Sequence, residues 1–168
     1  TLHFIINHWP SRRGGVLAGE ELRLSLAGMV KDLADSLQQT GSPCTKLIIA
    51  GDFNCNPDDP AIGLLTDIAK NNLNHASAEI VNLAGDLPVS EGGTYRYNGI
   101  WDMFDQIMVS GCLLSASQGL CTSQEMFRIF KPDFLLKKDP RFPGYTPFST
   151  YRGYRYQGGF SDHLPVLL

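Results

Sequence analysis

The segment Gly51-Asp52-Phe53-Asn54 places a carboxylate and a carboxamide at the end of a short apolar run. Side chains alternate along an extended chain, so Asp52 and Asn54 should point the same way. Together they could orient a water molecule, bind a hard cation through oxygen and donate an amide N–H to a phosphate oxygen. An Asx-rich turn would carry the same residues, because Asp and Asn are common turn formers. A hydrolytic site and a plain turn are therefore both open for this segment.

Imidazole and carboxylate groups recur in three other short segments. Asp162 and His163 precede a terminal apolar run, Asp105 begins an earlier apolar run, and His8 ends the opening one. An acid at the start of an apolar strand is costly unless it is paired, and His163 is the natural partner for Asp105. Taken alone, His8 and the Asp162-His163 pair could each be ordinary polar residues.

The elements that must position these groups follow a β-loop-α-β order. Apolar runs of strand length predict strands over residues 2–7, 46–50, 104–110 and 164–168. Apolar residues at three- and four-residue intervals predict an amphipathic helix over 19–39, and Asp58-Asp59-Pro60 predicts the start of a second helix. This order predicts an α/β architecture with functional groups at the strand ends.

Composition predicts one ordinary globular domain. The 168 residues are 43% hydrophobic and 18% charged, and 14 Lys and Arg against 17 Asp and Glu give a net charge of −3. No apolar run approaches the roughly 18 residues of a membrane span, so we expect a soluble protein. A near-neutral chain attracts polyanions weakly, so a nucleic-acid partner would need a local patch or a bound metal. Cellular location is undetermined, because any targeting signal would lie before Thr1.

Cysteine and histidine spacing disfavours a zinc site. The four histidines show no HExxH or HxxxH spacing. No CxxC pair occurs among the four cysteines, Cys44, Cys55, Cys112 and Cys121. We therefore expect free, buried thiols, and a metal bound by oxygen remains open.

Two basic segments are candidates for substrate contact. Arg12 and Arg13 follow the opening strand and could bind a substrate phosphate, although a solvated turn fits them equally well. Residues 131–159 are rich in Pro, Gly, Tyr and Arg and are predicted to be a surface excursion. Within it, Tyr151 and Arg152 could stack on bases or sugars. The alternative is a loop that packs on its own domain.

Taken in order along the chain, these segments resemble the endonuclease/exonuclease/phosphatase superfamily. The resemblance rests on Gly51-Asp52-Phe53-Asn54, on the strand from Asp105 to Ser110, and on Ser161-Asp162-His163. It covers residues 1–168, and the segment from Asn7 to Gly15 is especially similar to bacterial members assigned only at the superfamily level. The resemblance implies an α/β fold, the deoxyribonuclease I-like four-layer α/β sandwich, of which this chain supplies roughly the second half.

The resemblance also implies a metal-dependent phosphoric ester hydrolase that cleaves phosphodiester bonds. In this family's pattern, Asp52 would activate the attacking water and Asn54 would hold that water or a phosphate oxygen. His163, oriented by Asp105, would stabilise the charge that develops on phosphorus. His8 would contact the phosphate or protonate the leaving oxygen.

The metal implied by the resemblance is Mg²⁺, or Mn²⁺, with Asp162 as a ligand. The family's second ligand is a Glu from the first half of the fold, and that half has no counterpart in this sequence. We therefore expect a single, truncated domain over residues 1–168, and the activity of the isolated chain is open. Two alternatives stand: a phosphomonoesterase on a sugar or inositol phosphate, and a non-catalytic interaction module if the first half was never present. The sequence leaves open whether the substrate is a nucleic acid, a phospholipid or a sugar phosphate, and leaves the oligomeric state undetermined.

Overall fold

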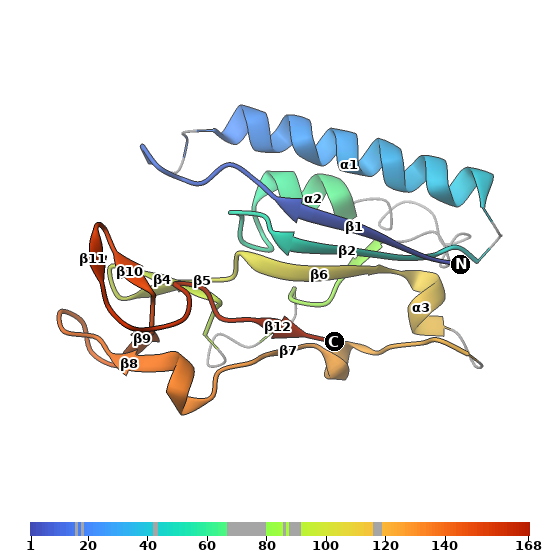
Figure 1. Cartoon of the computed structure of the whole chain (residues 1–168). Helices are drawn as coiled ribbons and strands as arrows, with labels where there is room; N and C mark the ends of the chain where they lie inside the picture. The colour runs from blue at the N-terminus through green and yellow to red at the C-terminus, as the bar shows by residue number, and fades with distance from the viewer. Residues whose placement is uncertain are drawn as a thin grey trace.

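A sheet in the order β1-β2-β6-β3 lies at the centre of the fold in the computed structural model (Figure 1). The structure describes residues 1–15, 17, 19–41, 44–66, 80–85, 87, 92–115 and 119–168. The strands of the sheet are β1 (Leu2–His8), β2 (Lys46–Asp52), β6 (Asp105–Ser110) and β3 (Ile80–Asn82). β1 and β2 run parallel, whereas β6 is antiparallel to both β2 and β3. The carboxyl ends of β1 and β2 therefore meet the beginning of β6.

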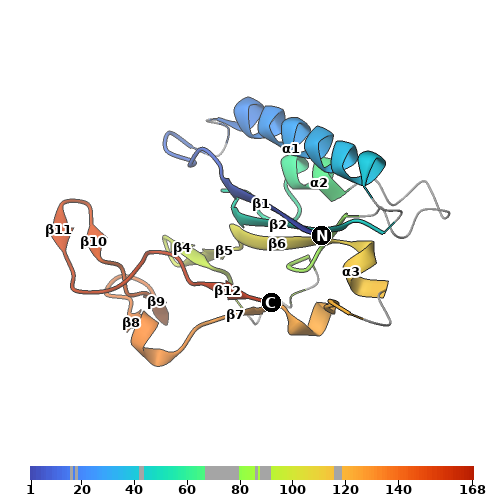
Figure 2. The same cartoon turned by 45° about the vertical axis from the view of Figure 1, so that its right-hand side comes forward.

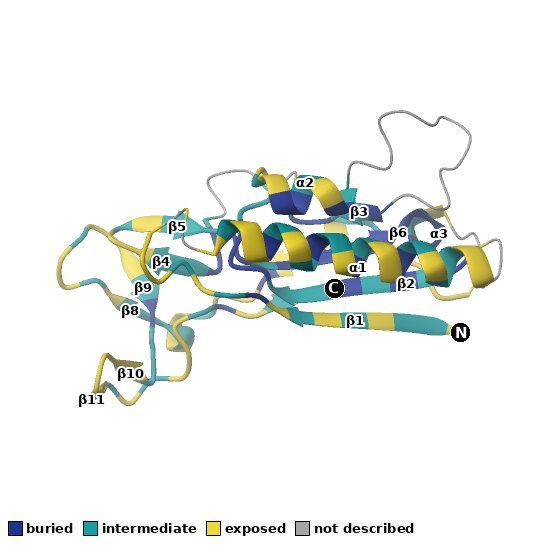
Figure 3. Cartoon of the chain, turned by 90° about the horizontal axis from the view of Figure 1, so that it is seen from above, coloured by how far each residue is buried: buried dark blue, intermediate teal, exposed yellow. Residues whose placement is uncertain are grey.

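Two helices cover one face of this sheet, α1 (Glu20–Thr40) and α2 (Pro60–Thr66) (Figures 1 and 2). Along α1, Ala27, Val30 and Ala34 are buried at helical spacing, and the opposite side of the helix is exposed (Figure 3). They share an apolar core with Leu47 and Ile49 of β2. Burial of this stripe stabilises the helix layer on the sheet.

The opposite face of the sheet packs against the later part of the chain. β7 (Arg128–Ile129) pairs with β12 (Val166–Leu167) in a short antiparallel ladder below β6 (Figure 1). Two short helices precede this ladder, α3 (Gly111–Ser115) and the 3₁₀ helix η2 (Gln124–Met126). Between these elements and strands β1, β2 and β6 lies an apolar groove of about 450 Å³.

Hairpins gather at the end of the sheet where β1 and β2 terminate (Figures 1 and 2). The strand pairs are β4 (Tyr95–Tyr97) with β5 (Ile100–Asp102), β8 (Leu136–Lys138) with β9 (Tyr145–Pro147), and β10 (Tyr151–Arg152) with β11 (Arg155–Tyr156). A 3₁₀ turn, η3 (Asp133–Leu135), precedes β8. The predicted surface excursion over 131–159 is therefore largely hairpin, because short antiparallel pairings satisfy its backbone groups.

The predicted elements are confirmed with small shifts at their ends. The main helix covers 20–40 where 19–39 was predicted, and the second strand extends to Asp52. The terminal strand is shorter than predicted, because β12 pairs over Val166–Leu167 alone. Among the described residues, no helix has both the length and the apolar character needed to cross a membrane.

The expectation that the cysteines are free thiols is wrong for one pair. Cys44, just before β2, and Cys112, in α3, form a disulfide with Cα atoms 5.4 Å apart. Cys55 is free and buried, as predicted, whereas Cys121 is free but exposed, so the expectation of burial is wrong for Cys121. The disulfide was not predictable from spacing, because its partners are 68 residues apart and meet only when α3 folds beside the start of β2.

Candidate active site

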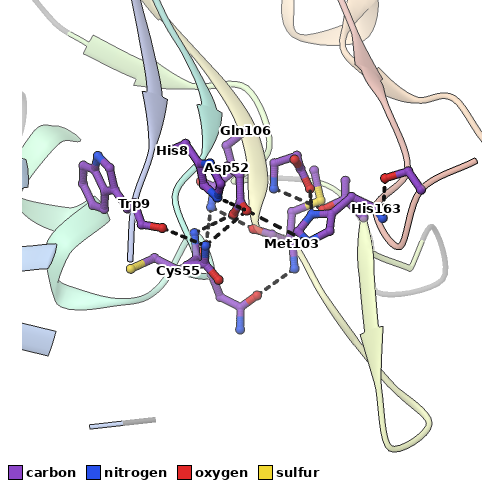
Figure 4. Close-up of polar contacts among 12 residues, drawn as sticks. His8, Trp9, Asp52, Cys55, Met103, Gln106 and His163 are labelled. Carbon is purple, nitrogen blue, oxygen red and sulfur yellow. Dashed lines mark hydrogen bonds and ion pairs between the residues drawn. The ribbon is translucent and has the colours of Figure 1, made fainter. Parts of the chain in front are cut away.

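Backbone register lines up three functional side chains across neighbouring strand ends. His8 at the end of β1 is opposite Asp52 of β2, and Asp52 is opposite Asp105 of β6. Side chains of directly opposed residues project to the same side of a sheet. We call these three residues, together with His163, the row. Figure 4 shows Asp52 between His8 and His163.

Asp52 is positioned by the close approach of β2 to β1. Gly51 has φ 140°, and a Cβ atom there would lie 1.9 Å from the carbonyl oxygen of Asn7, so this position requires glycine. Asn54 follows in the left-handed region with φ 50°. Its backbone N–H donates to Oδ1 of Asp52 at 2.9 Å, which closes an Asx turn.

The Asx turn also builds a site. Asn54 Nδ2 donates to Oδ2 of Asp52 at 3.1 Å and to the carbonyl of Trp9 at 3.0 Å. The same Oδ2 lies 3.7 Å from Nε2 of His8 and 4.0 Å from Nε2 of His163. The predicted Asx turn is therefore confirmed: one carboxylate oxygen of Asp52 closes the turn, and the other lies near two imidazoles.

Asp105 holds the ring of His163. Nδ1 of His163 donates to Oδ2 of Asp105 at 2.7 Å, so the predicted pairing of these residues is confirmed. With Nδ1 engaged, Nε2 is the nitrogen directed toward Asp52. The three groups form a line of carboxylate, imidazole and carboxylate, assembled from β6, the segment before β12, and β2.

Thr94 and Tyr95 hold both ends of the Asp105–His163 pair, and the sequence analysis missed them. The buried Thr94 accepts the N–H of Asp105 on its hydroxyl at 3.1 Å and the N–H of Leu164 on its carbonyl at 2.8 Å. The ring of Tyr95 packs on the ring of His163 with centroids 4.8 Å apart. Gly92-Gly93 was the available signal, since a Cβ at Gly93 would lie 2.3 Å from the carbonyl oxygen of Asp102.

Gln106 is a second positioning residue that the sequence did not reveal. It is fully buried, and its Nε2 donates to the carbonyls of Cys55 at 2.6 Å and Met103 at 2.8 Å. Its Oε1 accepts from Asn82 at 2.7 Å. A buried amide with all of these partners fixes the loop after Asp52 against the beginning of β6 (Figure 4).

Burial and neighbouring charges shift the pKa values of Asp52 and His163. Burial raises the pKa of Asp52, against the opposing effects of the Asn54 N–H and the nearby imidazoles. Burial alone would lower the pKa of His163, but the hydrogen bond and charge of Asp105, together with the charges of Asp52 and Asp162, raise it overall. Asp52 is thus a more basic carboxylate than an exposed one, and His163 holds its proton more strongly than free imidazole.

Arg12 contributes to the structure of the site, and its predicted contact with a substrate phosphate stays a prediction. Its Nε donates to the carbonyl of Asn54 at 2.9 Å, and its terminal nitrogen is paired with Asp59. The guanidinium also lies 4.7 Å from the ring centroid of Phe104. Arg13 is exposed nearby, and its charge opposes the rise in the pKa of Tyr95 that burial and Asp162 cause.

The other predicted contact residues differ in their place relative to the row. His8 belongs to the row but its side chain is 81% exposed, so a ligand can reach it. Asp162 is exposed beside His163, and Tyr151 and Arg152 are exposed on the β10–β11 hairpin. The roles predicted for these residues stay predictions.

The donors present fit a hard divalent cation. One ligand atom each from Asp52, Asp105 and His163 lies within 4.8 Å of the others, and the three side chains are half-buried. Asp162 lies outside that group, as an exposed carboxylate next to His163. Carboxylate oxygens are the ligands that Mg²⁺ and Mn²⁺ prefer.

Replacing Asp105 with Asn should lower the pKa of His163. NMR titration of the imidazole in chelator-treated wild-type protein should give a value above the ordinary 6.5, and Asp105→Asn should bring it down, because the charge and hydrogen bond of Asp105 are the largest effects that raise it. The signals of His3, near the other end of β1, are the internal reference. An unchanged His163 titration in the variant would contradict the pairing as the cause of the shift.

Comparison with known proteins shows what this chain is similar to. A family model described as "Endonuclease/Exonuclease/phosphatase family" matches residues 1–168. No curated protein matches the chain. Among solved structures, a mannosyl-6-phosphatase from Bacteroides thetaiotaomicron is 15% identical with a TM-score of 0.49, and the match covers 88% of this chain and 45% of that one. An endonuclease/exonuclease/phosphatase family protein from the same organism is 15% identical with a TM-score of 0.42, over 88% of this chain and 43% of that one. The chain thus spans less than half the length of these two proteins.

Proposed function

The chain belongs to the endonuclease/exonuclease/phosphatase family, and from this premise we propose that it carries the catalytic groups of a divalent-metal-dependent phosphodiesterase. Members of the family hydrolyse phosphate esters. The more specific proposal for this chain is that the ester cleaved is a phosphodiester. The observation that supports it most is the line formed by Asp105, His163 and Asp52, in which one imidazole lies between two carboxylates.

Asp52 is the group that accepts the proton of the attacking water. Its Oδ2 lies between the imidazoles of His8 and His163, and burial raises the pKa of the carboxyl group, which makes the carboxylate a stronger base. Asn54 keeps that oxygen in place through the bond from Nδ2. A fixed general base contributes about 10²- to 10⁴-fold to a rate.

His163 stabilises negative charge as the phosphorus becomes five-coordinate. Asp105 accepts from Nδ1 and fixes the ring, so Nε2 presents its N–H toward the reacting group. The raised pKa of His163 keeps more of the imidazole protonated at neutral pH. A preorganised cationic donor of this kind acts without reorganising during the reaction.

His8 is the group that contacts the phosphate or protonates the departing oxygen. It lies on the opposite side of Asp52 from His163, and its imidazole is largely exposed. An exposed imidazole can act as a hydrogen-bond donor to a phosphate oxygen or as a general acid.

Asp162 would hold the metal ion together with a ligand from outside the described residues. A bound divalent cation supplies charge neutralisation on the non-bridging phosphate oxygens. Asp162 is suited to this role because it is exposed at the edge of the row and adjacent in sequence to His163.

A diester fits the charge of the site better than a monoester. A terminal phosphate is close to a dianion at neutral pH, and it calls for several cationic partners. Arg12 is already bound by Asn54 and Asp59. The single negative charge of a diester is matched by His163 and a metal ion without a further arginine.

The proposal is tested by the substrate preference of the intact protein. With Mg²⁺ present, it should hydrolyse bis(p-nitrophenyl) phosphate faster than p-nitrophenyl phosphate, judged by kcat/KM. Replacement of His163 by Gln should remove the diesterase activity, because Gln cannot carry the positive charge. A clear preference for the monoester would contradict the diesterase proposal and favour a phosphomonoesterase.

A further inference from the structure

The β10–β11 hairpin displays aromatic and cationic side chains on opposite faces. Tyr151 is opposite Tyr156, with ring centroids 5.5 Å apart, and the two residues are 60% and 69% exposed. Arg152 is opposite Arg155, and both are exposed. Because side chains alternate along a strand, the tyrosines share one face and the arginines the other.

The tip of this hairpin is also aromatic. Gly153 has φ 59°, as a two-residue hairpin turn requires, and Tyr154 beside it is fully exposed. The guanidinium groups of Arg152 and Arg155 make no hydrogen bond or ion pair with the described part of the chain, although the charge of Arg152 acts on Asp139. The tip of this hairpin therefore presents its large side chains to solvent.

The base of the hairpin is fixed, so the exposed tip is held in a defined direction. Gln157 N–H donates to the carbonyl of Thr150 at 2.8 Å, and Phe160 N–H donates to that of Phe148 at 2.6 Å. Gly159 permits this approach, because a Cβ there would lie 2.0 Å from the carbonyl oxygen of Phe148. Phe160 is three residues before His163. The hairpin thus projects from the end of the sheet that carries the site (Figures 1 and 2).

Charge and aromatic groups concentrate in this part of the chain. Residues 131–159 contain six Lys or Arg and two Asp, a net charge of +4 in a chain of −3 overall. Five of the six tyrosines, all in described segments, are exposed in or beside the hairpins, at positions Tyr97, Tyr145, Tyr151, Tyr154 and Tyr156. A local cationic surface attracts polyanions even when the whole chain is acidic.

We propose that the β10–β11 hairpin is an arm that binds single-stranded nucleic acid, with the tyrosine face stacking on unpaired bases and the arginine face contacting phosphates. Exposed aromatic rings beside guanidinium groups are the combination that holds single strands with little sequence preference. This proposal rests on the proposed function in that the bound strand is taken to be the substrate of the catalytic row.

A nucleic-acid strand suits the arm better than a membrane surface. The rings of Tyr151 and Tyr156 form a pair on one side of the ladder, and they present π faces and hydroxyl groups and no aliphatic side chain. Insertion into lipid is favoured by buried apolar area, whereas this arm carries Arg, Gly and Tyr. Binding to vesicles is therefore an alternative that the experiment must separate.

The test is strand binding by the intact protein in chelator, so that no hydrolysis occurs. The affinity is measured from the fluorescence anisotropy of a fluorescein-labelled oligothymidylate of about 20 nucleotides, which is longer than one binding site. Tyr151→Ala/Tyr156→Ala should weaken binding at least about tenfold, whereas Tyr151→Phe/Tyr156→Phe should bind like wild type, because phenylalanine keeps the stacking face. A strand of the same length without bases should not distinguish the two double variants.

The arginines are tested through the salt dependence of binding. Arg152→Gln/Arg155→Gln should reduce the slope of log affinity against log salt by about 1.4, which corresponds to two phosphate contacts on a single strand. Arg128→Gln, which removes an exposed cation on β7, is the matched control and should leave both affinity and slope close to wild type.

Three outcomes decide the proposal. Wild-type affinity in the Tyr-to-Ala variant would overturn it, as would arm-dependent binding to phosphatidylserine vesicles without binding to the strand. Arm-dependent strand binding would support it. Failure of the proposed function gives a different result from failure of the arm. In that case wild-type protein would bind the strand through the arm but would not hydrolyse bis(p-nitrophenyl) phosphate with Mg²⁺.

Discussion

Replacing Asp52 with Asn should lower the turnover of the intact enzyme about 10²- to 10⁴-fold while its unfolding temperature moves little. The variant keeps the size of the side chain and loses the basicity that the attacking water requires. Two effects on stability oppose each other. Loss of a partly buried negative charge is favourable, whereas loss of an acceptor for Asn54 Nδ2 is unfavourable.

Steady-state kinetics and thermal unfolding must be measured on the same preparations, because loss of activity alone does not separate a lost base from a lost fold. Asp58→Asn is the matched control, since Asp58 is an exposed acid in the same loop. That variant should keep wild-type turnover. If Asp52→Asn instead unfolds while its folded fraction turns over normally, Asp52 serves the Asx turn and not the reaction.

Removal of divalent cations should abolish hydrolysis, and Mg²⁺ or Mn²⁺ should restore it. Asp162 offers carboxylate oxygens, which suit these ions, and the hydrolysis involves no redox change. The measurement is diester hydrolysis by the intact protein after treatment with chelator, followed by titration with each cation. Full activity in excess chelator would contradict a metal-dependent mechanism.

The position of the metal is tested separately through Asp162. Asp162→Asn should raise the Mg²⁺ concentration needed for half-maximal activity, because an amide oxygen is a weaker ligand than a carboxylate. Asp133→Asn, at an exposed acid in η3, is the control and should leave that concentration unchanged. An unchanged Mg²⁺ requirement in Asp162→Asn would remove Asp162 from the metal site.

Local patterns predicted the main elements and the residues that gather at their ends. Apolar runs of strand length predicted β1, β2 and β6, and helical apolar spacing predicted α1, because burial imposes these patterns directly on the sequence. The pairing of Asp105 with His163 was predicted for a similar reason, since an acid at the start of an apolar strand requires a partner.

The sequence did not predict the roles of Thr94 and Arg12, because these roles depend on partners that are distant in the sequence. Thr94 looks like any threonine until its hydroxyl and carbonyl meet Asp105 and Leu164, which are brought together from opposite ends of the second half of the chain. Arg12 looked like a free cation, and the fold directs it to Asn54 and Asp59. Hydrogen bonds between distant segments leave no periodicity in the sequence.

The sequence by itself determined which residues could do chemistry and at which strand ends they would lie. The tertiary structure decided how they face one another: the register of β1, β2 and β6 aligned His8, Asp52 and Asp105, and the return of the chain placed His163 between two carboxylates. It also decided that Tyr151 and Arg152 lie exposed on a hairpin. The physical reason is that side-chain type is a local property, whereas distance, burial and hence pKa depend on which segments pack together.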